Sequence, residues 1–80
     1  MLRTQFVVIE QDGVWKIRYE GKHIGWYNTR RDALHAAINA AYDLAKGGKP
    51  YSPRVLAQSG HTSELRTEWT YGSDPYPPHL

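Results

Sequence analysis

The chain has 80 residues, 40% hydrophobic and 22% charged, which is typical of one small globular domain without room for a second core. It contains no cysteine, which excludes disulfides, thiolate metal sites and cysteine nucleophiles, and favours a cytoplasmic location. The formal net charge of +2 favours anionic partners only weakly. We expect no signal peptide and no membrane span, because no apolar run approaches the roughly 20 residues that a span requires.

The N-terminal third predicts a three-stranded antiparallel meander. An apolar run at 6–10 precedes Asp12-Gly13, which is typical of a two-residue hairpin turn because both positions need positive φ. Residues 14–20 alternate between apolar and polar, and a turn at Gly21-Lys22 leads to a third strand at 23–27. This register places one set of side chains on an inner face: Phe6, Val8, Ile17, Tyr19, Ile24 and Trp26. The opposite face then carries Val7, Ile9, Lys16, Arg18, Gly25 and Tyr27.

An amphipathic helix is expected next. Thr29 is its predicted N-cap, and the glycines at 47–48 end it in the left-handed conformation that glycine adopts without strain. Apolar residues at helical spacing, among them Leu34, Ile38 and Ala41, form the stripe that we expect to be buried.

Two further strands are predicted at 54–59 and 64–71, with a turn near Gly60-His61 between them, and Leu65 and Trp69 are expected in the core. The order β-β-β-α-β-β predicts an α+β fold: an antiparallel sheet of about five strands with one helix packed on one face.

We divide the chain into a domain at 1–72 and a proline-rich tail at 73–80, since prolines cannot donate the hydrogen bonds of a sheet. We expect this tail to be ordered through Tyr76 and folded back against the domain. The alternative is a free proline-rich arm that binds the groove of a partner.

Residues of catalytic type are scattered. The four histidines lie by a turn, on the wet helix face, in a loop and in the tail, without the spacing of metal ligands. No serine lies in a Gly-x-Ser-x-Gly motif, and no glycine-rich phosphate loop precedes a helix. We therefore expect no enzyme activity, no catalytic residue, no cofactor and no metal.

Basic residues mark two candidate binding surfaces. Arg30 and Arg31 open the helix, where free N–H groups and guanidinium groups suit an anion, unless both arginines simply extend into water. Lys16, Arg18 and Arg66 are expected on the sheet face that a single helix leaves uncovered. Basic groups among aromatic side chains suit single-stranded nucleic acid.

The same uncovered face also suits a protein partner, and we rank this interpretation above nucleic-acid binding. Its apolar and aromatic side chains suit a protein partner or a second copy of the chain, and the chain's own tail is a third candidate to cover it. The residues expected to make these protein contacts are Val7, Ile9, Tyr27 and Tyr76. The predicted function is a non-catalytic binding module, with protein contact or self-association first and nucleic acid as the alternative.

The strings WKIRYEGKHIGWY and EWTYGSDPYPP are aromatic-rich and unlike generic amphipathic sequence. Through them, and through a Thr-x-x-x-Ala-Leu start to an alanine-rich helix, the chain resembles a group of short bacterial proteins classed as a domain of unknown function. The likeness runs from about Phe6 to Pro78. It implies a bacterial, cytoplasmic protein and supplies no activity, cofactor or site residue.

Overall fold

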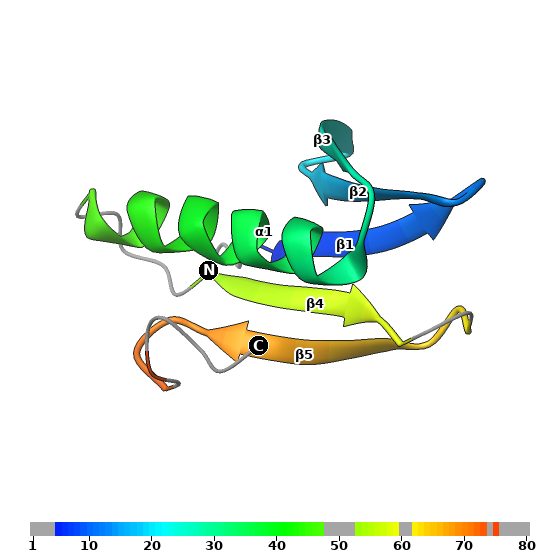
Figure 1. Ribbon diagram of the computed structural model, residues 1–80. Helices are drawn as coiled ribbons and strands as arrows, with labels where there is room; N and C mark the ends of the chain where they lie inside the picture. The colour runs from blue at the N-terminus through cyan, green and yellow to red at the C-terminus, as the bar shows by residue number, and fades with distance from the viewer. Residues whose placement is uncertain (1–4, 48–52, 60–61, 74, 76–80) are drawn as a thin grey trace.

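The computed structural model describes residues 5–47, 53–59, 62–73 and 75. Within them the elements are, in chain order, β1 (Gln5–Gln11), β2 (Val14–Tyr19), β3 (Lys22–Tyr27), α1 (Arg30–Lys46), β4 (Arg54–Gln58) and β5 (Leu65–Thr70). The predicted order of elements is confirmed, and α1 packs on one face of the sheet (Figure 1).

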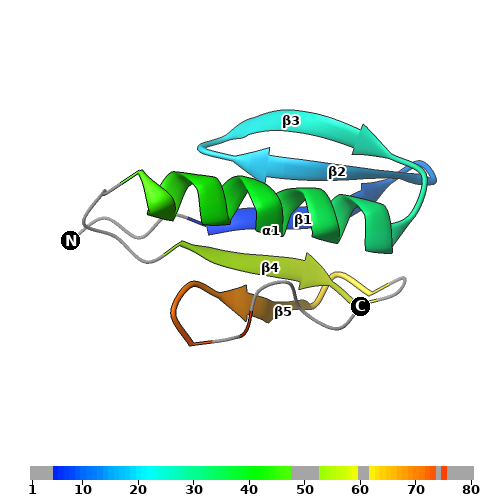
Figure 2. The same cartoon turned by 60° about the vertical axis from the view of Figure 1, so that its left-hand side comes forward.

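The strands form one sheet in the order β3-β2-β1-β4-β5 (Figure 2). All neighbours are antiparallel except β1 and β4, which are parallel, so the prediction of a fully antiparallel sheet is wrong at this pair. The reason lies in the connection. Because β3 runs in the direction of β1 and α1 then returns the chain to the opposite end, β4 starts beside the start of β1.

The first hairpin forms as predicted. Asp12 and Gly13 have φ angles of 55° and 79°, the positive values that a two-residue turn of this kind requires. Val8 pairs with Ile17 and Phe6 with Tyr19, whose ring stacks on that of Phe6 at a centroid distance of 4.4 Å. Turn chemistry and alternation were sufficient to define this register.

The second hairpin differs from the prediction. Its turn is Glu20-Gly21, with φ angles of 51° and 78°, so Tyr19 pairs with Lys22. The register then shifts between Ile17 and Arg18, with the result that Ile17 lies opposite Gly25. Such a bulge places an extra residue in one strand and reverses which side chains face the core.

The bulge changes the environment of three predicted residues. Ile24 and Trp26, expected in the core, are 48% and 65% exposed, and Trp26 lies opposite Lys16. Tyr27, expected on the uncovered face, lies opposite Trp15 and packs against the core. A Cβ atom on Gly25 would lie 2.7 Å from Cε2 of Tyr27, so the glycine leaves room for this ring above the strand.

A second register shift, between Val55 and Leu56, affects β5. Trp69 lies opposite Val55 and is 1% exposed, which confirms its place in the core. Leu65, also predicted for the core, lies opposite Gln58 and is 39% exposed, so that prediction is wrong.

Most of the predictions made for the helix are confirmed. Thr29 Oγ1 accepts a hydrogen bond from the backbone N–H of Asp32 at 3.1 Å, and Leu34, Ile38 and Ala41 are buried. Gly47 follows the helix with a φ of −73°, so the predicted left-handed conformation does not occur there. The buried cluster between α1 and the sheet comprises Phe6, Val8, Trp15, Ile17, Ala33, Leu34, Ala37, Ile38, Ala41, Val55, Ala57 and Trp69.

Two described residues of the predicted tail contact the domain. The backbone N–H of Ser73 donates a hydrogen bond to the carbonyl oxygen of Thr70 at 3.2 Å. Trp69 Nε1 donates a hydrogen bond to the carbonyl oxygen of Pro75 at 3.1 Å, which brings Pro75 beside a buried side chain. Tyr76 and the turn expected at Gly60-His61 lie outside the described residues.

Candidate binding surface on the open sheet face

The sheet face opposite α1, called the open face below, presents two rows of side chains that cross the strands. Directly opposed residues of neighbouring strands share a face, so the pairings define the rows. The first row is Trp26, Lys16, Ile9, Gln58 and Leu65, in which Ile9 and Gln58 continue the β1–β4 register by one residue. The second row is His23, Arg18, Val7, Leu56 and Thr67.

The charge on this face has one sign. Lys16 and Arg18 lie side by side in the two rows, and Arg54 shares the face by its alternation with Leu56. Among the described strand residues that point to this side, none is an aspartate or a glutamate. The guanidinium Nε of Arg54 is buried without a hydrogen-bond acceptor in the described part of the chain. The surface therefore favours negative partners.

An exposed indole lies beside these cations. The Nζ atom of Lys16 is 4.4 Å from the centroid of the Trp26 ring, within cation–π range, and donates a hydrogen bond to Gln11 Oε1 at 2.8 Å. These two contacts position the ammonium group over the ring. About two thirds of Trp26 nevertheless remains accessible.

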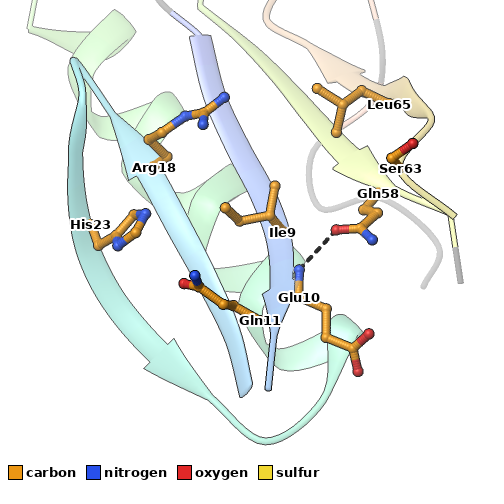
Figure 3. A pocket seen from close by; sticks show the side chains of 8 residues that line it. All are labelled: Ile9, Glu10, Gln11, Arg18, His23, Gln58, Ser63 and Leu65. Carbon is orange, nitrogen blue, oxygen red and sulfur yellow. Dashed lines mark hydrogen bonds between the residues drawn. The ribbon is translucent and has the colours of Figure 1, made fainter. Parts of the chain in front are cut away.

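A shallow depression of about 590 Å³ lies on the open face around Ile9 (Figure 3), the residue of β1 that pairs with Lys16. Ile9 lies at its centre, with Arg18 and His23 on the β2–β3 side and residues of β4 and β5 on the other. The Glu10 side chain points away from Arg18 and His23. The full lining is Ile9, Glu10, Gln11, Arg18, His23, Gln58, Ser63 and Leu65.

Gln58, at the rim of the depression, forms hydrogen bonds to two other elements. Its Oε1 accepts a hydrogen bond from the backbone N–H of Glu10 at 2.9 Å, and this side-chain contact joins β4 to β1 where the described parallel pairing ends. The backbone carbonyl of Gln58 accepts a hydrogen bond from Arg30 Nε at 2.8 Å. The depression is thus supported on one side by strand contacts and by the start of α1.

The two arginines at the helix start have different environments. Arg30 Nη2 forms an ion pair with Glu68 Oε2 at 2.9 Å, in addition to its bond to Gln58. Its donors therefore join α1 to β4 and β5. Arg31 is exposed on the helix surface. The structure does not present the two as a pair of equivalent anion ligands.

The predicted grouping of Lys16, Arg18 and Arg66 is only partly correct. Arg66 lies opposite Ala57, a core residue beneath α1, and its Nε atom is 3.6 Å from Oε1 of Glu64. It belongs to the helix side at the edge of the sheet because the register shift in β5 reverses the expected alternation. Lys16 and Arg18 do share the open face.

The residues predicted for protein contact do not all lie on the open face. Val7 and Ile9 lie on the open face, although Val7 is only 6% exposed between its neighbours Arg18 and Leu56. Tyr27 faces the core instead, and Tyr76 lies outside the described residues.

Sequence reasoning missed several residues of this face, among them Trp26 and Arg54. A signal for Trp26 was present, since a glycine inside a strand, here Gly25, often marks a bulge.

In the part of the chain that the structure describes, no three histidine, aspartate or glutamate side chains are grouped to hold a metal ion. Nor does any helix there have the length and apolar character needed to cross a bilayer. Comparison of the chain with family models, with curated proteins and with solved structures gives no match in any of the three.

Proposed function

We propose that this protein is a non-catalytic binding module whose open face contacts a negatively charged macromolecule. The observation that supports it is that Lys16, Arg18 and Arg54 lie on one face with an accessible indole, and that none of the described strand side chains that point to this face is a carboxylate. An isolated cation on a protein surface is ordinary. A face of a single sign next to exposed apolar surface favours a complementary partner.

The sign of the charge disfavours a dimer formed by two open faces. Such a dimer would bring Lys16 and Arg18 of both copies into one interface in which no described strand side chain that points to the face is a carboxylate. Like charges brought together in an interface cost free energy. The negative partner would instead pair with these cations.

Self-association through β3 is the second candidate. This strand lies at the edge of the sheet and carries Ile24 and Trp26, two exposed apolar residues. An edge strand with exposed apolar residues is a template for pairing with another chain. A light-scattering mass equal to twice that of the chain would favour this candidate.

The proposal is tested by mapping amide chemical shifts while either poly-L-glutamate or a single-stranded oligonucleotide is added at low salt. We expect shifts to concentrate on β1, β2 and β3 and to disappear as salt rises. The double variant Lys16→Glu/Arg18→Glu should abolish them. The control Arg31→Glu/Arg66→Glu changes the net charge equally but lies off the open face, and should retain them. Equal loss in both variants, or no shifts with either polymer, would contradict the proposal.

A further inference from the structure

We infer that the partner of the open face is a single-stranded nucleic acid, with a base stacked on Trp26 and backbone phosphates held by Lys16 and Arg18. This inference rests on the proposed function, because it names the class of macromolecule that the same face binds.

Trp26 gives the first reason to prefer a nucleic acid over an acidic protein. An acidic protein segment would use the cations of this face but has no specific use for an exposed indole. Every nucleobase has a flat aromatic surface, and stacking of bases on aromatic side chains contributes to the binding of single strands of any sequence. The indole is 65% exposed, which leaves room for a base.

The positions of the cations fit a backbone that passes this indole. Lys16 and Arg18 are two residues apart on β2 and point to the same side, so they are separated by roughly 7 Å along the strand. The Lys16 ammonium lies 4.4 Å from the Trp26 ring centroid and is held there by Gln11. A base on the indole therefore has a cation beside it for its phosphate, and Arg18 serves a neighbouring phosphate.

The depression around Ile9 provides a place for a second base. Ile9 at its centre offers an apolar contact, while Gln11, Gln58 and Ser63 around it carry amide and hydroxyl groups that can bond to base edges. Its lining runs from His23 on β3 to Leu65 on β5, which is four strand spacings or about 19 Å. A single base occupies part of this width.

A single strand is favoured over a duplex for two reasons. In a duplex the base faces stack on one another and are not available to Trp26 or Ile9. A helix is a common element to enter a major groove, and α1 lies on the other side of the sheet from the cations (Figure 1). The open face meets exposed bases more readily than a groove.

The test uses the full chain and fluorescein-labelled oligo(dT) and oligo(U) of about 15 nucleotides, within the site sizes known for sheet-based binders. A duplex of the same length and poly-L-glutamate are the comparison ligands. Affinity is measured by fluorescence anisotropy between about 50 and 200 mM salt. We expect the single strands to bind more tightly than both comparison ligands and to quench the tryptophan fluorescence.

Three variants identify the contacts. Trp26→Ala should weaken binding of the single strands about 5- to 150-fold, the range for loss of one stacked base, and Trp26→Phe should restore part of it. Lys16→Gln and Arg18→Gln should each weaken binding and reduce the slope of log K against log salt by about 0.7. Arg31→Gln removes the same charge from α1 and should change the affinity less than about twofold.

Each contrary outcome has a definite meaning. Unchanged affinity in Trp26→Ala, or equal affinity for duplex and single strand, would overturn the inference. Binding of poly-L-glutamate through Lys16 and Arg18 without binding of oligonucleotides would also overturn it, while the proposed function would stand. Absence of binding to every polyanion at low salt would contradict both.

Discussion

Arg30, which was predicted to bind an anion, instead forms contacts within the fold. As a cation in the first turn of α1, it lies at the positive end of the helix dipole, an unfavourable position of a few tenths of a kcal/mol. The ion pair with Glu68 and the hydrogen bond to the Gln58 carbonyl offset this cost. Its main role follows from these contacts: it joins the start of the helix to β4 and β5.

Replacing Arg30 with alanine should therefore reduce the free energy of unfolding by about 1–3 kcal/mol, because two acceptors lose a charged donor. The partial exposure of both partners, 32% for Arg30 and 28% for Glu68, favours the lower part of this range. Urea denaturation followed by circular dichroism measures the change. Arg31→Ala is the matched control and should stay within about 0.5 kcal/mol. Equal losses in both variants would show that the Arg30 contacts do not contribute.

At the scale of elements, α1 is held mainly by its buried stripe. Leu34 and Ile38 are 2% and 0% exposed, and truncation of either to alanine should cost about 2–5 kcal/mol by loss of contacts and creation of a cavity. Guanidinium denaturation midpoints report this change. His35→Ala, on the exposed side between them, should leave the midpoint nearly unchanged. If the midpoints of Leu34→Ala and Ile38→Ala also failed to move, the assigned helix register would be wrong.

The elements that sequence reasoning predicted correctly depend on local signals. The Asp12-Gly13 turn, the Thr29 cap and the apolar stripe of α1 each involve residues close in the chain. The two register shifts are different, because a bulge depends on how a strand packs against its neighbours. One extra residue reverses the facing of the side chains on one side of it relative to those on the other. Trp26, which follows the extra residue in β3, and Leu65, which precedes the one in β5, were therefore assigned to the wrong face. The parallel β1–β4 pair likewise depends on tertiary contacts.

The same limitation decided how well the candidate surface was predicted. Lys16, Arg18 and Ile9 were placed correctly because their strands, β1 and β2, form the first hairpin, whose register was predicted correctly. Trp26 and Arg66 lie beyond the shifts and were placed on the wrong side. The residue that most favours a nucleic acid was therefore hidden by a single bulge in β3.

At the scale of the whole molecule, one helix on one face of five strands leaves the sheet asymmetric. The small residues of α1, such as Ala33, Ala37 and Ala41, are fully buried and allow the helix to approach the sheet closely. Aromatic and branched side chains fill the same layer. The opposite face lacks a covering layer among the described residues, and its cations and exposed indole are thus available for binding.

The C-terminal segment contributes to this arrangement through Trp69. The indole N–H of this core residue donates to the Pro75 carbonyl, so a contact six residues along the chain supports the buried cluster. The prolines of the segment restrict the unfolded chain, which lowers the conformational entropy lost when the segment docks. The docked tail that we predicted is thus supported at Pro75, and its other residues remain a prediction.

Truncation after Gly72 removes the Pro75 carbonyl and should lower the free energy of unfolding by about 1–3 kcal/mol, the cost of taking the acceptor from a buried donor. Truncation after Tyr76 retains the Pro75–Tyr76 peptide group and is the matched control, with a stability close to that of the full chain. Thermal and urea unfolding of the three chains gives the comparison.

The indole N–H resonance of Trp69 should shift, and its hydrogen exchange should accelerate, only in the shorter truncation. If both truncated chains were as stable as the full one and this resonance did not change, the segment would be a free arm. Because the contact lies on a core residue and not on the open face, the truncation should leave the affinity of that face for polyanions unaltered.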